Sequence, residues 1–139
     1  MGTFNGTSYD GVLGMLASGY NFSSYTGNGL ITTMTDALSG LTGLGVGQSA
    51  DVLGIAGSTT AIYEGQIVDS TAIIVKYTYA GDTNLDGLID AVDYGIIDNY
   101  FQFPGSNAYF NGDYNFDGII DAADYGIIDN AYQLQGAPL

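Results

Sequence analysis

The sequence has no cysteine, no histidine and no tryptophan, and Lys76 is its only basic residue. The absence of cysteine excludes disulfides and thiolate metal ligands, and with histidine also absent a zinc site is disfavoured. Nucleic acids and anionic membrane surfaces are poor candidates for partners, because binding to either depends on lysine and arginine. No apolar run approaches the roughly 18 residues that are needed to span a membrane.

Residues suited to catalysis are scarce as well. Glu64 is the only glutamate, and without histidine or cysteine the sequence lacks the paired groups on which acid–base or nucleophilic catalysis depends. We therefore expect no enzymatic activity. The sequence does provide for a core, because 46% of its 139 residues are hydrophobic and 13% are aromatic. This composition predicts a folded rather than a disordered chain.

Acidic residues outnumber basic residues by 15 to 1, which gives a formal net charge of -14. Ten of the 15 acids lie between Asp82 and Asp129. Carboxylates concentrated in this way, without basic partners in the chain, repel one another unless an external charge neutralises them. The pattern therefore favours a bound metal cation.

The first part of the sequence, residues 1–80, is rich in Gly, Ser and Thr and has short apolar runs between turn signals. We predict a small, Gly-rich β-domain here. Residues 70–79 (STAIIVKYTY) predict a strand that is central to a sheet, because they combine β-branched and aromatic residues without a breaker. Glu64-Gly65 predicts a hairpin turn between strands at residues 61–63 and 66–68.

Three further elements in this part are predicted from weaker patterns. Residues 12–16 and 30–34 predict strands, and residues 48–53 predict one short helix with Ser49 as its N-cap. Together these elements predict an α+β protein, in which the β-domain is followed by a second domain over residues 81–139.

An internal repeat dominates the second part. Residues 81–102 (GDTNLDGLIDAVDYGIIDNYFQ) and 112–133 (GDYNFDGIIDAADYGIIDNAYQ) are identical at 16 of 22 positions, at an offset of 31. Each copy predicts a loop followed by an amphipathic helix, and two such helices are expected to pack antiparallel about a pseudo-twofold axis. The predicted apolar faces consist of Ile89, Val92, Ile96 and Tyr100, and of Ile120, Ala123, Ile127 and Ala131.

Each copy opens with a 12-residue loop of the pattern D-x-N-x-D-G-x-I-D-x-x-D, at residues 82–93 and 113–124. A calcium ion takes roughly six to eight oxygen ligands, which a loop of this length supplies by wrapping around the ion. The central glycine allows the sharp turn that such wrapping needs. For two calcium ions, the predicted ligands are Asp82, Asn84, Asp86, the Leu88 carbonyl, Asp90 (directly or through water) and Asp93, and then Asp113, Asn115, Asp117, the Ile119 carbonyl, Asp121 and Asp124.

The alternative is that each DxNxDG segment is only a turn with local Asx capping. Two loops in identical register, each with acids at the ninth and twelfth places, favour metal sites instead. Calcium is favoured over magnesium, which demands octahedral geometry and gives up its water reluctantly. Compared with a standard EF-hand, the twelfth residue is Asp rather than Glu, and a predicted strand rather than a helix precedes Asp82.

The doubled GDxNxDGxIDxxDY pattern closely resembles the type I dockerin repeat, a half EF-hand made of one loop and one helix. The resemblance implies a non-catalytic calcium-binding domain that binds a protein partner, cohesin, through helix residues just after each metal loop. The matching positions are Ala91-Val92 and Ala122-Ala123, with Asp98-Asn99 and Asp129-Asn130 further along. These residues are small or acidic, whereas cellulosomal dockerins often have hydroxyl residues and a base there.

Residues 41–79 resemble, more loosely, the region that precedes dockerin-type repeats at the C-terminal end of large secreted bacterial surface proteins. This implies an extracellular or cell-surface location. Met1 is followed by neither a basic nor an apolar stretch, so we expect that any targeting segment lies upstream or has been removed.

Two functions fit these features. One is a calcium-stabilised docking module that attaches to a protein partner. The other is a self-assembling subunit of an extracellular filament or surface layer, in which a neighbouring copy completes the exposed sheet edges of the β-domain. Asn5-Gly6-Thr7 and Asn21-Phe22-Ser23 are glycosylation sequons, so a glycan at Asn5 or Asn21 also remains open.

Overall fold

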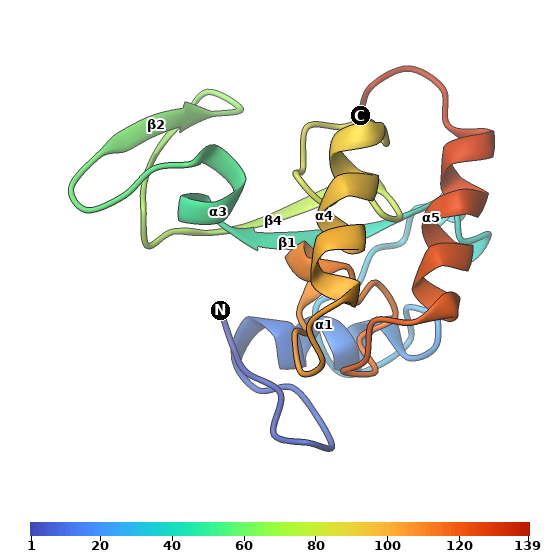
Figure 1. Cartoon of the computed structure of the whole chain (residues 1–139). Helices are drawn as coiled ribbons and strands as arrows, with labels where there is room; N and C mark the ends of the chain where they lie inside the picture. The colour runs from blue at the N-terminus through green and yellow to red at the C-terminus, as the bar shows by residue number, and fades with distance from the viewer.

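The computed structural model describes all 139 residues and confirms a mixed α+β chain. Figure 1 shows two long helices, α4 and α5, beside a two-stranded ribbon, with a separate hairpin that projects away from them. In chain order the elements are α1 (Gly11–Tyr20), α2 (Thr35–Leu38), β1 (Thr42–Gln48), α3 (Ser49–Leu53), β2 (Thr60–Tyr63), β3 (Gln66–Asp69), β4 (Ile73–Tyr79), α4 (Ala91–Phe101), the 3-10 helix η1 (Tyr109–Asn111) and α5 (Ala122–Leu134).

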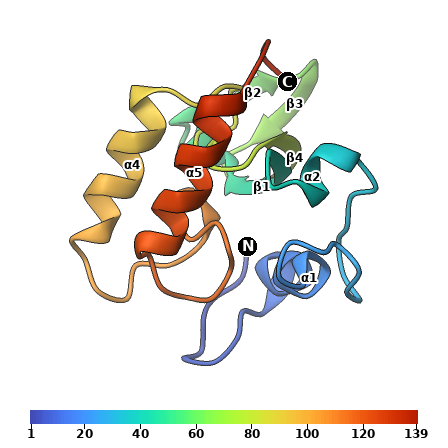
Figure 2. The ribbon, with the colours of Figure 1, turned by 90° about the vertical axis from the view of Figure 1, so that its right-hand side faces the viewer.

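The ribbon of β1 and β4 lies at the centre of the molecule. Its strands are antiparallel, with Val46 opposite Val75. Figure 2 shows α4 and α5 on one side of this ribbon and α1 and α2 on the other. The strand predicted over residues 70–79 is confirmed as β4, but the prediction that it is central to a sheet is wrong, because β1 is its only neighbour.

Strand β1 was not predicted, because its sequence TGLGVGQ contains three glycines, which have a low preference for strands. The structure shows why glycine is needed there. A Cβ atom added at Gly45 would lie 2.6 Å from Leu85 Cδ2, and one added at Gly47 would lie 2.5 Å from Val52 Cγ2. The bare backbone of β1 therefore leaves room for Leu85, a residue of the first repeated loop.

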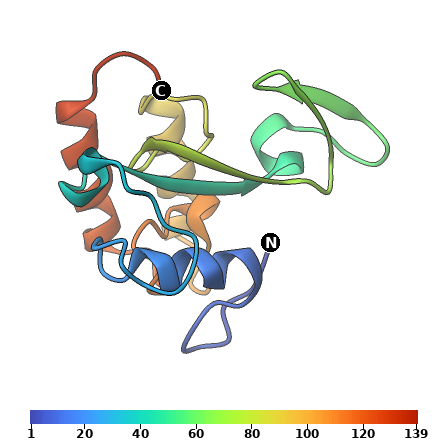
Figure 3. The same ribbon diagram turned by 180° about the vertical axis from the view of Figure 1, so that it is seen from behind.

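The predicted hairpin is confirmed as β2 and β3, with Glu64-Gly65 at its turn. Both turn residues have positive φ angles, of 49° and 80°, which match a tight turn between twisted antiparallel strands. Figures 1 and 3 show this hairpin extending beyond the ribbon, away from α4 and α5. On its outward face Ile62 and Ile67 are paired across the strands and are 73% and 77% exposed.

The segment before β1 differs from the prediction. Residues 12–16 were expected to form a strand, but they lie within helix α1, which buries Leu13 and Leu16 on one face. The helix ends at Asn21 in a left-handed conformation that closes its last turn. The strand predicted at residues 30–34 is also absent, because that stretch has no regular structure. Residues 1–80 thus contain three helices, α1, α2 and α3, where a β-domain with one short helix was expected.

The short helix predicted at residues 48–53 is confirmed as α3, but Ser49 is not its N-cap. Gln48 takes the cap position, and Ser49 is the first helical residue. The Ser49 hydroxyl instead donates a hydrogen bond to the Asp69 carbonyl, which ties α3 to the end of β3.

Helices α4 and α5 follow the two repeated loops and lie side by side in Figures 1 and 2, with opposite chain directions. Their buried faces match the predicted ones only in part. The fully buried apolar residues are Ile97 in α4 and Ile128 and Ala131 in α5, so Ala131 is buried as predicted, whereas Val92 is 54% exposed. Ile89 and Ile120 are buried as expected, but they lie in the loops ahead of the helices.

One cluster of 14 buried residues forms the hydrophobic core. It combines residues from before the repeat with residues from the repeated loops and helices, so both parts of the chain share it. The members are Tyr9, Leu13, Leu16, Val46, Ile74, Tyr79, Leu85, Ile89, Ile97, Tyr109, Tyr114, Ile120, Ile128 and Ala131. The division into domains at residues 80 and 81 therefore stays a prediction. Every helix is too short or too polar for a membrane-spanning segment.

Candidate metal centre

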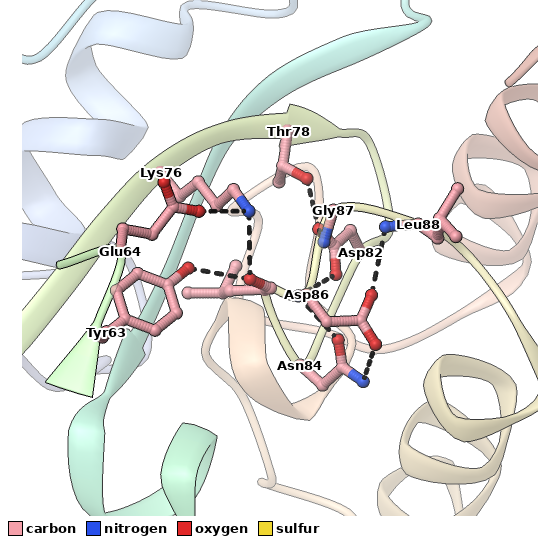
Figure 4. Close-up of polar contacts among 10 residues, drawn as sticks. Tyr63, Glu64, Lys76, Thr78, Asp82, Asn84, Asp86, Gly87 and Leu88 are labelled. Atoms are coloured by element: carbon pink, nitrogen blue, oxygen red, sulfur yellow. Dashed lines mark hydrogen bonds and ion pairs between the residues drawn. The ribbon is translucent and has the colours of Figure 1, made fainter. Parts of the chain in front are cut away.

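The first loop, residues 82–93, is folded by hydrogen bonds from its own backbone to its carboxylates. Asp82 accepts from the amide of Asp86 at 3.1 Å and from that of Gly87 at 2.8 Å. Gly87 has a φ angle of 98°, which a residue with a side chain rarely adopts. The predicted turn at the glycine is thus confirmed, and Figure 4 shows Asp82 beside Gly87.

Asn84 and Asp86 extend the same network. The Asn84 side-chain oxygen accepts from the Asp86 amide at 2.9 Å, and Asp86 Oδ1 accepts from the Leu88 amide at 3.1 Å. The Asn84 side-chain nitrogen donates to Asp86 Oδ2 at 2.9 Å. Figure 4 shows these polar groups next to one another on the loop. Three of the predicted ligands, at the first, third and fifth places, are therefore neighbours in space.

The ninth and twelfth residues connect the loop to its helix. Asp90 is the N-cap of α4 and accepts from the Val92 amide at 2.7 Å. Asp93 returns a bond, because its Oδ2 accepts from the Asp90 amide at 2.9 Å, and together they form a capping box. Asp93 Oδ1 also accepts from the Thr83 amide at 2.7 Å. Asp93 thus joins the start of the helix to the start of the loop.

The second loop, residues 113–124, repeats this network bond for bond. The equivalent acceptors are Asp113, Asn115, Asp117, Asp121 and Asp124, and Asp121 with Asp124 forms the same capping box before α5. The fourth residues of the loops, Leu85 and Phe116, also share a φ angle of 60°. Such a left-handed conformation is uncommon for residues other than glycine and marks a backbone set by the loop rather than by local preference.

Comparison with known families agrees with this geometry. Residues 80–133 match the family described as the dockerin type I domain. This part of the chain is a dockerin-like domain. The chain shows no significant match to any curated protein or to any solved structure. The recognition made from the doubled loop pattern is thereby confirmed, and the matched range begins one residue before the first repeat.

Within the dockerin-like domain, four carboxylates are buried completely. Asp82, Asp93, Asp113 and Asp124 each have an exposed fraction of 0%. No cation in the chain is paired with them, because the only salt bridge joins Lys76 to Glu64 at 2.9 Å. Buried charges without an opposite charge are strongly unfavourable. These four buried carboxyl groups therefore have no salt-bridge partner in the chain.

Burial raises the pKa of these carboxyls. The pKa of Asp93 rises to about 6 and that of Asp124 to about 7, from an ordinary value of 3.8, because desolvation outweighs the hydrogen bonds they accept. The pKa values of Asp82 and Asp113 are raised too, again mainly by desolvation. A nearby cation favours the ionised form of a carboxyl group. A bound cation would therefore stabilise these four carboxyl groups, whose ionised forms burial disfavours.

The donor set of the domain suits a hard cation. All predicted side-chain donors are carboxylate or amide oxygens, and the carbonyls of Leu88 and Ile119 accept no hydrogen bond within the chain. As the side chains stand, no three carboxylates converge closely enough to enclose an ion. In each loop the third and fifth side chains are hydrogen-bonded to each other: the Asn84 amide donates to Asp86, and the Asn115 amide donates to Asp117.

The two loops differ in the contacts that reach them from outside. In the first loop, the hydroxyl of Thr78, near the end of β4, donates to Asp82 Oδ2. In the second, the hydroxyl of Tyr9 donates to Asp113 Oδ2. Sequence reasoning missed both residues. Thr78 lies four residues from its acceptor, but Tyr9 lies 104 residues away, and no local pattern could connect it to the loop.

The first loop also contacts the hairpin. The Leu85 carbonyl accepts from the Tyr63 hydroxyl at 2.7 Å and from Lys76 Nζ at 3.3 Å. Lys76 in turn pairs with Glu64 at the hairpin turn, as Figure 4 shows. The hairpin is therefore attached to the dockerin-like domain through the backbone of the first loop.

Proposed function

We propose that the dockerin-like domain binds two calcium ions, one in each loop, and that the calcium-stabilised fold is a non-catalytic docking module for a protein partner. The observation that carries this proposal is the set of four fully buried carboxylates without a cationic partner. Calcium would supply the missing positive charge at each loop. Magnesium fits less well, since it prefers to keep much of its water shell.

In the first loop the ligands would be the side chains of Asp82, Asn84, Asp86, Asp90 and Asp93 and the carbonyl of Leu88. In the second they would be Asp113, Asn115, Asp117, Asp121 and Asp124 and the carbonyl of Ile119. Binding would hold Asp93 and Asp124 ionised at the starts of α4 and α5. Since each of them also belongs to the capping box of its helix, calcium occupancy would fix the orientation of the two helices.

The docking surface would lie on the exposed faces of α4 and α5. Ala91, Val92, Ala122 and Ala123 are exposed at the helix starts, at the places that correspond to the dockerin recognition positions. Two reciprocal bonds link the helices: Tyr94 donates to Asp129 at 2.6 Å, and Tyr125 donates to Asp98. Asp98 and Asp129 thus form hydrogen bonds between the two helices. This supports a partner that contacts the small apolar residues at the helix starts, rather than a cohesin that binds a basic residue of the dockerin.

Calcium titration by isothermal calorimetry tests the binding step. We expect two ions per chain for the parent protein, and one ion for each of the variants Asp82→Ala and Asp113→Ala. A matched control is Asp36→Ala, which removes an exposed carboxylate in α2, outside the loops. Absence of calcium binding in the parent protein would overturn the proposal, as would an equal effect of all three substitutions. An extracellular location is proposed along with the docking role and needs its own test in the native cell.

A second candidate function is self-assembly into an extracellular filament or surface layer. The feature that favours it is the projecting hairpin, which presents Ile62 and Ile67 on its outward face. Each two-stranded sheet also has unpaired edges, which can accept a strand from another chain. Copies of the chain would then be the partner.

Light scattering over a range of protein concentrations separates the two functions. Self-assembly predicts large particles in calcium that are lost in the double variant Ile62→Thr/Ile67→Thr, since both residues are exposed and threonine suits a strand. The control Val92→Thr changes an exposed apolar residue on α4, which is 54% exposed. A parent protein that stays monomeric at every concentration rejects self-assembly and leaves the docking module.

A further inference from the structure

The N-terminal segment completes the second loop from outside the dockerin-like domain. The Tyr9 hydroxyl donates to Asp113 Oδ2 and at the same time accepts from the Ala108 amide at 2.8 Å. Tyr9 is 7% exposed, so this hydroxyl is shielded from water. Its acceptor Asp113 is the first residue of the loop and is fully buried. One hydroxyl thus bridges the first-position carboxylate and the backbone that leads into the loop.

The rest of the segment is built around Tyr9. Phe4 and Tyr9 form an isolated β-bridge, and their ring centroids are 5.0 Å apart. The Phe4 ring lies directly against Gly118, where an added Cβ atom would be 2.2 Å from Phe4 Cζ. Two backbone bonds, from Asp10 to the Thr3 carbonyl and from Val12 to the Met1 carbonyl, fold the segment back on itself. Residues 1–10 therefore contact the second loop through both its first and its sixth residue.

The first loop has no contact of this kind. Its first-position carboxylate, Asp82, accepts from Thr78 in the strand just before the loop. Its glycine, Gly87, lies against the backbone of Leu139 at the other end of the chain. Two loops with nearly identical sequences therefore depend on different parts of the protein.

We propose that Tyr9 is a positioning residue for the cation of the second loop, so that occupancy of this loop and order in residues 1–10 are coupled, while the first loop depends on Thr78. This inference rests on the proposed calcium binding. A residue that donates to a ligand carboxylate fixes the ligand's orientation, and loss of such a partner typically lowers metal affinity by roughly 10- to 100-fold. The bond also gives Asp113 Oδ2 a second donor beside the Gly118 amide, which donates to the same oxygen at 2.8 Å.

Reciprocal substitutions test the assignment of each residue to its loop. Tyr9→Phe removes one hydroxyl without changing the ring, and Thr78→Val does the same at the first loop. Calcium is added while the backbone amides of Gly87 and Gly118 are followed by NMR, because each amide donates to the first-position carboxylate of its own loop. Tyr9→Phe should weaken calcium binding roughly 10- to 100-fold at Gly118 and leave Gly87 unchanged. Thr78→Val should do the opposite.

A matched control removes a hydroxyl of the same kind elsewhere. Tyr25 is also 7% exposed and lies outside both loops, so Tyr25→Phe should leave both calcium affinities unchanged. Circular dichroism of each variant in calcium shows whether it is folded. A general loss of stability would weaken calcium binding at both loops. It therefore cannot explain opposite effects of Tyr9→Phe and Thr78→Val at the two loops of a folded protein.

Hydrogen exchange tests the coupling. In the parent protein, calcium should slow exchange of the amides of Asp10 and Val12, which form the bonds of the N-terminal fold. The effect should be lost in Tyr9→Phe and in Asp113→Ala but kept in Asp82→Ala. If the parent binds two ions yet Tyr9→Phe changes neither the Gly118 affinity nor this protection, the inference fails while calcium binding stands. If the parent binds no calcium, the proposed function fails first.

Discussion

Chelation of calcium should leave the protein more stable at pH 5 than at pH 7.5, which is the reverse of ordinary acid denaturation. The reason lies in Asp93 and Asp124, whose pKa values in the folded chain are about 6 and about 7 instead of 3.8. A carboxyl with a raised pKa binds its proton more tightly in the folded than in the unfolded state. Its contribution to stability is complete below pH 3.8 and is lost as the pH rises through 6 and 7.

The size of the effect follows from these pKa values. At pH 5 both carboxyls are mostly protonated in the folded chain but mostly ionised in the unfolded chain, whereas at pH 7.5 they are mostly ionised in both. The resulting difference in the free energy of unfolding is about 4 kcal/mol in favour of pH 5. For a chain of this length that corresponds to a shift of roughly 10–20 °C in Tm. The raised pKa values of Asp82 and Asp113 act in the same direction.

Calcium should remove or invert this dependence, because binding requires ionised ligands and releases their protons. A tenfold excess of calcium over its Kd adds about 1.4 kcal/mol for each site, and this gain is largest at pH 7.5. Thermal melting followed by circular dichroism, at both pH values, with chelator and with calcium, gives the four values required. The double variant Asp93→Asn/Asp124→Asn is the control and should lose most of the pH dependence in chelator. A chelated parent protein that melts at a lower temperature at pH 5 than at pH 7.5 would refute the reasoning.

Two further substitutions test the packing around the loops. Leu85→Ala should lower the free energy of unfolding, measured by urea denaturation, by about 2–5 kcal/mol, because Leu85 is fully buried against Gly45. The control Leu134→Ala, at a residue that is 60% exposed, should change it by less than about 0.5 kcal/mol. Tyr94→Phe should cost less than about 1 kcal/mol, because its bond to Asp129 is exposed to water, and a larger loss in the same assay would show that the helix pair depends on this bond.

The parts of the fold that sequence patterns predicted correctly are those with strong local signals. The Glu64-Gly65 turn, the strand β4 and the two loop-and-helix units all carry such signals in adjacent residues. The same holds for the glycine turns at Gly87 and Gly118. The assignment of the twelve ligands and of calcium to these loops stays a prediction, with the buried carboxylates as its support.

The errors occurred where tertiary contacts decide the local structure. Strand β1 has glycines because Leu85 packs on them, a reason that its own sequence does not contain. Residues 12–16 of helix α1 were taken for a strand because they form a short apolar run between turn signals, although Leu13 and Leu16 have the spacing of a helix face. In α4 the buried side is centred on Asp93 and Ile97, so a pattern search limited to apolar residues selected a neighbouring face. A buried aspartate is unusual on the inner face of a helix, and in α4 the capping box with Asp90 accounts for its position.

Near-identity of the two repeats does not make them equivalent in the folded protein. Every bond inside the first loop has a counterpart in the second, so the sequence of the repeat fixes the loop conformation. The surroundings are not repeated: β4 and the hairpin reach only the first loop, and the N-terminal segment reaches only the second. The same substitution in both loops should therefore have different consequences. Asp82→Ala should loosen the hairpin, whose contacts converge on Leu85, while Asp113→Ala should release residues 1–10, and hydrogen exchange of the two segments would distinguish these outcomes.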